Sequence, residues 1–208
     1  MVTEGYKFAA APIILGVAAL FLGWHVLPLQ IAAFVLLALG TFILYFFRDP
    51  ERVIPSDPSA IVSPADGRIL EVVDEKFGER AGKRITIFLA VWNVHVNRTP
   101  MAGKISRIDY RPGKFQMAMK KTASAENEQN ILYLDTARGQ IVFKQIAGMI
   151  ARRVVLWKKV GDTVARGERI GIVRFGSRMD VWLPQDTEIA VNPGDHVAGG
   201  SSILAHWT

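Results

Sequence analysis

Gly176 and Ser177 form the residue pair in this chain with the clearest chemical potential. They lie between two apolar runs, residues 170–173 and 181–183, whose length and branching are typical of β-strands. A Gly-Ser pair between two strands is most often a simple turn. If Ser177 is instead a nucleophile, its hydroxyl needs a neighbouring base at neutral pH, and that base needs a partner that orients it.

His95 is the candidate base. It follows the strongly apolar residues 85–94, where a lone histidine is usually a structural residue. A purely structural strand has no use for a polar cluster, so the neighbours of this histidine favour a chemical role. Those neighbours are Trp92, Asn93, Asn97 and Arg98.

Three carboxylates are candidates for orienting the base, namely Asp66, Asp180 and Asp49. Asp66 lies in a Pro-Ala-Asp-Gly segment, where the alternative role of its side chain is to cap the turn. Asp180 is expected to lie on the strand that follows Ser177. The residues by themselves leave this choice open.

A glycine before the serine suits one reaction in particular. If Ser177 Oγ attacks the carbonyl carbon of Gly176, the peptide becomes an ester, and glycine leaves that carbonyl unhindered in a strained turn. Removal of the Ser177 Cα proton then expels the Gly176 carboxylate and leaves a dehydroalanine. Hydrolysis of the dehydroalanine gives a pyruvoyl group and ammonia, so the chain would divide into residues 1–176 and 177–208.

The elements that must position these residues follow a β pattern, which begins after a proline-containing linker. Turn residues separate short, branched or alternating runs at the spacing of a sandwich or barrel. Residues 114–121 are expected to form a short helix and residues 122–129 a mobile loop. The two strands that flank Gly176-Ser177 are expected to hold the pieces together by strand pairing after a cut. The expected strands are residues 68–73, 84–94, 104–110, 131–135, 140–146, 153–157, 170–175 and 181–183.

Internal repeats refine this fold prediction. The pattern Gly-Asp-x-Val-x-x-Gly occurs at residues 161–167 and again at residues 194–200. It resembles the hammerhead turns of biotinyl and lipoyl carrier domains, in which glycine permits a positive φ. We therefore predict a mainly β fold, with a barrel-sandwich-like domain of the biotinyl/lipoyl type.

Residues 1–47 are predicted to form an N-terminal membrane hairpin of two apolar helices, ahead of a β domain at residues 48–208. The apolar segments 8–24 and 29–47 would be about 26 and 28 Å long as helices, close to a hydrocarbon core of ~30 Å. Basic residues flank the pair on both sides, so the positive-inside rule places both ends in the cytoplasm. A shallow hairpin lying in one leaflet is the alternative. The length of the apolar region argues against a signal peptide.

The formal net charge is +6 at pH 7. Basic chains bind nucleic acid or anionic membranes. Here the basic residues are scattered among the strands, and the N-terminus is apolar. The anionic surface of the cell membrane is therefore the favoured partner, with the β domain on the cytoplasmic side, and nucleic acid is not expected.

Four motifs, taken in order, resemble the phosphatidylserine decarboxylases, specifically the short bacterial and archaeal-like branch. Each motif is weak alone, but the ordered set is specific. The resemblance covers residues 46–208, and within that range Asn127-Glu128 also falls in the family order. The motifs are Ser-Pro-Ala-Asp-Gly at 63–67, Trp-Asn-Val-His-Val-Asn-Arg at 92–98, Gln-Ile-Ala-Gly-Met-Ile-Ala-Arg-Arg at 145–153 and Arg-Phe-Gly-Ser-Arg-Met-Asp at 174–180.

This resemblance implies a zymogen that cuts itself between Gly176 and Ser177, with Asp66, His95 and Ser177 as the self-cleavage triad. Ser177 would become a pyruvoyl cofactor, which forms a Schiff base with the substrate amine and accepts the electrons released as CO2 departs. The implied substrate is phosphatidylserine, a membrane phospholipid, and the products are phosphatidylethanolamine and CO2. His95 would protonate the carbanion. No metal is implied.

The sequence departs from the longer bacterial members of that family at two places. They have Leu-Gly-Ser-Thr where residues 175–178 here read Phe-Gly-Ser-Arg, and they have a second histidine at the position of Trp92. Either His95 serves both steps or another group takes the second one. The substrate phosphate needs cationic donors. The candidates for that role are Arg98, Arg152, Arg153 and Arg178.

Two other functions fit part of the pattern. A membrane-anchored, non-catalytic lipoyl-like adaptor agrees with the repeats, but a carrier needs a lysine at its hairpin tip, and residues 175–178 contain none. A membrane-tethered metallopeptidase would need clustered ligands, which the His-Val-Asn of residues 95–97 does not supply. Both alternatives predict a single uncut chain. The sequence leaves the lipid tails and the oligomeric state open, with a homodimer among the options.

Overall fold

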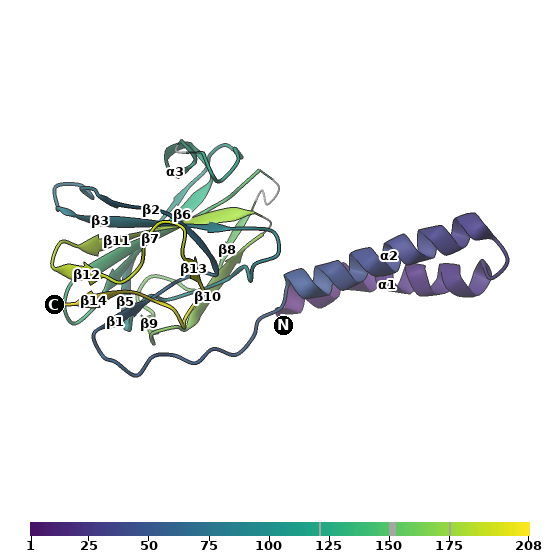
Figure 1. Cartoon of the computed structure of the whole chain (residues 1–208), viewed down its shortest axis with the longest axis horizontal. Helices are drawn as coiled ribbons and strands as arrows, with labels where there is room; N and C mark the ends of the chain where they lie inside the picture. The colour runs from purple at the N-terminus through teal and green to yellow at the C-terminus, as the bar shows by residue number, and fades with distance from the viewer. Residues whose placement is uncertain (121, 150–152, 175) are drawn as a thin grey trace. The chain divides into compact units, whose positions relative to one another are not determined.

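The computed structural model describes residues 1–120, 122–149, 153–174 and 176–208. They form two compact units, Met1–Glu51 and Arg52–Thr208. The first unit is helical and the second is built mainly of β-strands (Figure 1). The prediction of a mainly β chain that begins with two apolar helices is confirmed.

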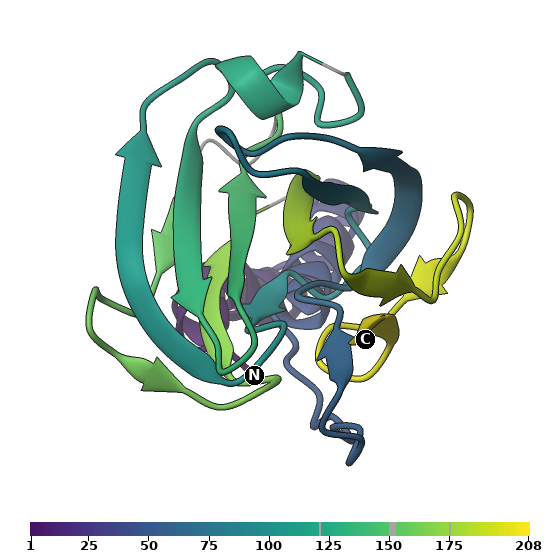
Figure 2. The same ribbon diagram turned by 90° about the vertical axis from the view of Figure 1, so that its left-hand side faces the viewer.

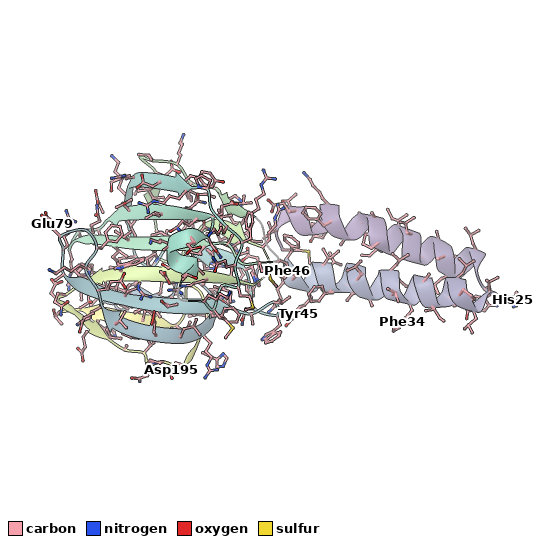
Figure 3. All side chains as sticks on the ribbon, turned by 90° about the horizontal axis from the view of Figure 1, so that it is seen from above. His25, Phe34, Tyr45, Phe46, Glu79 and Asp195 are labelled. Atoms are coloured by element: carbon pink, nitrogen blue, oxygen red, sulfur yellow. The ribbon has the colours of Figure 1, made fainter. Side chains whose placement is uncertain are left out.

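The first unit is a helical hairpin of α1 (Thr3–Leu22) and α2 (Leu27–Phe46). Both helices begin a few residues earlier than the apolar pattern predicted. Proline stands in the first turn of α2, where its missing N–H costs no helix hydrogen bond. His25 lies in the turn between the helices (Figure 3). Both helices are long and apolar enough to cross a membrane.

Glycines let these two helices approach closely. A Cβ on Gly16 would lie 2.8 Å from Leu37 Cγ, and one on Gly40 would lie 2.5 Å from Ile13 Cγ1. Helices in lipid associate through such small residues. Large side chains face outward instead, and Phe34 projects away from the hairpin (Figure 3). The outer surface of the hairpin is therefore apolar, as a lipid environment favours.

The second unit is a β domain whose described residues form three antiparallel sheets and one short helix, α3 (Ala123–Glu126). The strands are β1 (Ala60–Val62), β2 (Gly67–Asp74), β3 (Gly82–Leu89), β4 (Val96–Arg98), β5 (Gly103–Arg111), β6 (Gln129–Asp135), β7 (Gln140–Ile146), β8 (Val154–Leu156), β9 (Thr163–Val164), β10 (Arg169–Val173), β11 (Ser177–Pro184), β12 (Thr187–Ile189), β13 (His196–Val197) and β14 (Ile203–Trp207). The largest sheet curls round in the order β13-β2-β3-β11-β7-β6-β5-β9 (Figure 2). The smaller sheets have the orders β1-β14-β12 and β4-β10-β8.

Strand β11 lies in the middle of the largest sheet and separates two environments. Met179 and Val181 belong to the hydrophobic core. Successive side chains of a strand point to opposite faces, so Arg178 and Asp180 lie on the other side of the sheet. By the same alternation Ser177 is on the core side. The sheet therefore separates the hydroxyl of Ser177 from the charged side chain of Arg178.

The two strands that flank Gly176 and Ser177 belong to different sheets. Strand β10 pairs with β4 and β8, whereas β11 pairs with β3 and β7. The two flanking strands therefore do not pair with each other, and a prediction of pairing between them is wrong. Strand β11 pairs instead with β3 and β7, which precede it in the chain. Gly176, at φ +58, lies where the chain passes from one sheet to the other.

The helix predicted at residues 114–121 is wrong for the described residues of that segment. Helix α3 lies instead within the segment that was expected to be a loop. Asn127 supplies the reason, because its Oδ1 accepts the N–H of Gln116 and its Nδ2 donates to the carbonyl oxygens of Gln116 and Ala147. Side-chain bonds of this kind offer the backbone an alternative to helix hydrogen bonds.

The two Gly-Asp-x-Val-x-x-Gly segments have matching backbone turns. The first glycines, Gly161 and Gly194, have φ of +95° and +103°, and the glycines at the other end, Gly167 and Gly200, have φ of +74° and +80°. In each copy the aspartate accepts the backbone N–H of the residue three positions earlier. Only glycine adopts such angles without strain, which accounts for its place in both copies.

Candidate active site

Ser177 is the first residue of β11, and its side chain is fully buried. It lies directly opposite Leu89 of β3. Its Oγ has no hydrogen-bond partner within the described part of the chain. A buried hydroxyl left unsatisfied costs about 1–3 kcal/mol, so its presence calls for a chemical explanation.

His95 lies beside the Gly176–Ser177 bond. Its Nε2 is 3.2 Å from the backbone nitrogen of Gly176, and its Nδ1 is 2.9 Å from the carbonyl oxygen of Asn93. A carbonyl can only accept, so Nδ1 carries the proton and Nε2 accepts the N–H of Gly176. The imidazole therefore presents its unprotonated nitrogen to the Gly-Ser segment, as a general base requires.

The prediction that the strand before His95 extends to residue 94 is wrong. Strand β3 ends at Leu89, and the chain then makes a turn before β4. Asn93 closes this turn, because its Oδ1 accepts the N–H of Ala90 and its own N–H donates to the Ala90 carbonyl. The polar residues before the histidine thus shape a turn that aims the imidazole back at β11.

Gly148 lies against the carbonyl group of Gly176. A Cβ on Gly148 would be 1.7 Å from the carbonyl oxygen of Gly176, whereas a Cβ on Gly176 would meet nothing within 4 Å. The two glycines are therefore required for different reasons, Gly148 for space and Gly176 for its φ of +58°. No sequence pattern singled out Gly148, although it lies inside the motif at residues 145–153.

Asp66 is held by two groups that the sequence did not predict. Arg52 Nη2 lies 2.9 and 2.8 Å from the two carboxylate oxygens of Asp66, and the backbone N–H of Gly199 donates to Oδ1 at 2.8 Å. Both side chains of the Arg52–Asp66 ion pair are largely buried. These bonds fix the carboxylate firmly. The role of Asp66 as the partner of His95 stays a prediction.

Three buried amides cross the domain interior close to these residues. Gln145 Nε2 donates to Asn97 Oδ1 at 2.9 Å, and Asn130 Nδ2 donates to Gln145 Oε1 at 3.2 Å. Asn97 is two residues from His95, and Gln145 is paired with Met179 on β11. The network therefore links β4, β6 and β7 around the start of β11. The amide side chains at 97 and 145 were visible in the motifs, but no pattern indicated that they meet.

Arg178 is engaged by Asp180 rather than available to a ligand. Its Nε lies 2.6 Å from Asp180 Oδ1, and both side chains are almost completely buried. Thr86 and Ser124 donate to the two carboxylate oxygens of Asp180 at 3.0 and 2.5 Å. Arg178 Nη1 also contacts the backbone carbonyl of Lys120 at 3.5 Å. The network ties the start of β11 to the segment around α3.

A polar cavity of about 480 Å³ lies on this outer side of the sheet. Lys144 lines this cavity, and burial lowers the pKa of its ammonium group. The nearby carboxylate of Asp180 raises that pKa, but by less than burial lowers it. The ammonium lies 4.5 Å from the centre of the Trp182 ring. Arg84, Arg111 and Arg178 also line the cavity. Glu71 and Glu75 line the cavity as well, and it is on the opposite side of β11 from Ser177.

The other predicted phosphate ligands are dispersed. Arg98 is buried and donates from Nη1 to the carbonyl of Gly167 at 3.0 Å. Arg153 is exposed, and Arg152 lies outside the described residues. The structure therefore does not bring the four predicted arginines together into one anion site among the residues it describes.

Comparison with known proteins agrees with the motif order. Residues 39–205 match the family described as phosphatidylserine decarboxylase. A phosphatidylserine decarboxylase proenzyme of Solibacter usitatus is 48% identical over 205 residues, which cover 99% of this chain and 96% of that protein. The proenzyme of Symbiobacterium thermophilum is 43% identical, with coverage of 97% and 93%. That of Desulfotalea psychrophila is 49% identical, with coverage of 84% for both chains.

Proposed function

This chain belongs to the phosphatidylserine decarboxylase family, and we propose that it cuts itself between Gly176 and Ser177 and then converts phosphatidylserine to phosphatidylethanolamine and CO2. One observation carries the proposal. The hydroxyl of Ser177 is buried without a partner among the described residues, and the residue before it donates its N–H to the unprotonated Nε2 of His95. The candidate base therefore contacts the residue next to the candidate nucleophile, on the segment that contains the predicted cleavage bond.

In the proposed self-processing, His95 removes the proton of Ser177 Oγ, and the oxygen attacks the Gly176 carbonyl carbon. The C–N bond breaks, the Ser177 nitrogen takes up a proton, and an ester joins Gly176 to the Ser177 side chain. Loss of the Ser177 Cα proton breaks the Cβ–O bond and releases the Gly176 carboxylate. One water then converts the dehydroalanine to a ketone and releases ammonia. The position of Gly148 supports this course, because it leaves the attacked carbonyl free of side-chain bulk on that side.

We propose that the resulting pyruvoyl group is the cofactor. The site fits a group made from its own side chain, because the Ser177 side chain is enclosed and uses none of its hydrogen-bonding capacity on the described residues. The group supplies an electron sink for the decarboxylation. His95 is placed to hold or deliver the proton that the product carbon needs. Asp66 is proposed to complete the triad by fixing the surrounding backbone and, through it, the imidazole.

The two pieces, 1–176 and 177–208, are proposed to stay associated after the cut. Support comes from the sheet order, since β11 lies between β3 and β7, which both belong to the first piece. Strand β14 likewise pairs with β1, and β13 with β2. Three separate strands of the short piece are thus held by strands of the long one. A processed homodimer is compatible with this arrangement.

The apolar hairpin is proposed to span the cell membrane, with the β domain on the cytoplasmic side. The length and apolar surface of α1 and α2 support a membrane location, and the basic residues at both ends support the orientation. An enzyme acting on a lipid headgroup would thereby remain at the surface that holds its substrate. The anionic membrane surface is the proposed partner of the basic chain.

We also propose that the β domain is related in architecture to the biotinyl and lipoyl carrier domains. The matching φ angles of the two Gly-Asp-x-Val-x-x-Gly turns support this relation. These turns lie in segments that β9 and β13 attach to the largest sheet. Their role here is structural, since the chemistry is proposed for the start of β11.

Substitution of Ser177 by alanine tests the function. We expect the Ser177→Ala protein to remain one chain of full mass and to release no CO2 from phosphatidylserine in mixed vesicles. The unsubstituted protein should give two masses, 1–176 and a 177–208 piece that carries a ketone in place of its amine. Decarboxylation by the Ser177→Ala protein would overturn the proposal.

A further inference from the structure

Three loops meet at the end of the β domain where Ser177 lies, and we call their described residues the rim loops: those within 90–95, 112–128 and 147–153. The first follows Leu89, which is paired with Ser177, and the last follows Ile146, which is paired with Arg178. The middle loop is bonded to the last one, because Asn127 Nδ2 donates to the Ala147 carbonyl at 2.7 Å. The opposite end of β3 leads to the β2–β3 turn, where Glu79 lies (Figure 3).

The rim loops expose an unusual share of large apolar side chains. Among the described residues of the β domain, eight such side chains are exposed, and four of them belong to these loops. Trp92 is 68% exposed, Met119 62%, Met149 54% and Met117 52%. Water does not favour this concentration, whereas tryptophan and methionine suit the boundary between lipid tails and headgroups.

The charges of the rim loops select the partner. Lys114, Lys120 and Arg153 are exposed in them. Of their two described acidic residues, Glu126 forms a neutral pair with Lys114 at 2.9 Å and Glu128 is buried, so Lys120 and Arg153 remain as the exposed charges outside that pair. Apolar side chains among basic ones match an anionic phospholipid surface, in which the tails meet the former and the headgroups meet the latter.

We propose that the rim loops form a second membrane contact, separate from the helical hairpin, which dips into the anionic leaflet. The inference rests on the proposed function and names the surface through which the lipid headgroup reaches Ser177. Ser177 is fully buried at the start of β11, next to the two strand ends, Leu89 and Ile146, from which the first and last rim loops leave the sheet. A lipid that stays in its leaflet thereby needs to move only its headgroup into the protein.

The chain has no cysteine, so one introduced cysteine reports on a single place. In the full-length protein, Met119→Cys and the control Val160→Cys would each carry an environment-sensitive fluorophore. Val160 is 55% exposed and lies next to Gly161, which is bonded to Ile105 near the far end of β5. Both proteins would be reconstituted through the hairpin into vesicles of neutral or of partly anionic phospholipid, with or without brominated tails.

We expect the label at 119 to shift to the blue and to be quenched by brominated lipid, more strongly in anionic vesicles, while the label at 160 is unaffected. Equal behaviour of the two labels would overturn the proposal. A shift at 119 that appears in detergent and grows with protein concentration would also overturn it, in favour of contact between copies of the chain. This readout needs no catalysis, so it fails or succeeds independently of the decarboxylase assignment.

A kinetic test uses Met117→Ser with Met119→Ser, against Val160→Ser. We expect the double variant to be processed normally and to lose about tenfold in kcat/KM on phosphatidylserine in anionic vesicles. It should keep its activity on a short-chain phosphatidylserine dissolved as monomers. Equal losses on both substrates would mean that these methionines act on the site itself, and would contradict the membrane contact.

Discussion

The carbonyl oxygen of Gly176 lies so close to Gly148 that a Cβ on Gly148 would be 1.7 Å from it. The bond proposed to break is thus packed against the one residue type that has no side chain. The peptide group that precedes Gly176 is held as well, because Gly176 N–H donates to His95 Nε2 at 3.2 Å. Gly148 and His95 together restrict where the attacked carbonyl can lie.

A methyl group at Gly148 should therefore slow self-processing. We expect Gly148→Ala to lower the rate of cleavage by on the order of 100-fold, because a displacement of about 1 Å at a reacting carbonyl costs that much. Intact mass over time measures the rate. Gly78→Ala is the control, since Gly78 has φ +62 but open space around it. The chains of Gly148→Ala that do become cut should have ordinary turnover per pyruvoyl group, and a loss there as well would point to general damage.

His95 should be required as a base rather than as a packing residue. We expect His95→Gln, which keeps a comparable volume, to lower the cleavage rate by about 10²- to 10⁴-fold. The thermal midpoint should change little by comparison, because a glutamine amide can also bond to the backbone groups that the imidazole contacts at Asn93 and Gly176. Normal processing of His95→Gln, seen by intact mass, would assign the base elsewhere.

Asp66 should act at a distance, through the backbone that it fixes. We expect Asp66→Asn to slow cleavage by about tenfold, less than the loss of the base itself. Its bonds go to Arg52 and to Gly199 N–H, and an amide can keep only part of them. Arg52→Met is the matched control for the ion pair. If Arg52→Met and Asp66→Asn lose the same stability and the same cleavage rate, Asp66 serves only that ion pair.

The Arg178–Asp180 pair should be essential for the stability of β11. Asp180→Leu alone would leave the Arg178 guanidinium buried without its counter-charge, and we expect a loss of about 3–5 kcal/mol in the free energy of unfolding. The double variant Arg178→Met with Asp180→Leu should be less destabilised than Asp180→Leu, because no charge is then buried. Chemical denaturation of uncut protein in the Ser177→Ala background measures both, and additive losses would contradict this.

Lys144 should make the free energy of unfolding depend on pH in the alkaline range. Burial lowers the pKa of its ammonium in the folded protein below the ordinary value of 10.5. Between the folded and unfolded pKa values the unfolded chain binds more protons, so stability rises with pH in that window. At neutral pH we expect Lys144→Met to raise the thermal midpoint by ~2–4 °C, for a gain of about 1 kcal/mol. The difference should shrink as the pH approaches 10.5, and a constant difference would contradict the assignment.

The sequence motifs were sufficient to single out Gly176, Ser177 and His95, and the structure brings His95 to Gly176. They could be singled out because the chain has only four histidines and because Gly-Ser lies between two apolar runs. The arginines were expected to bind the substrate phosphate, but the structure does not gather the described ones into one site. A positive charge in the sequence does not indicate which group the side chain will contact. Arg178 lies against Asp180 because residues two apart on a strand share one face of the sheet. Thr86, on the neighbouring strand β3, donates to Asp180 on that same face. No local pattern carries that information.

What the sequence determined by itself was the local chemistry: two apolar helices, a mainly β domain, and the residues that can react. Periodicity and residue type act over a few positions, so they are legible along the chain. What only the tertiary structure decided was proximity between distant segments. It brought Gly148 against Gly176, turned residues 90–95 so that His95 faces β11, and separated β10 from β11 into different sheets. These three features depend on contacts between segments far apart in the chain. Packing of the whole core decides which distant segments come together.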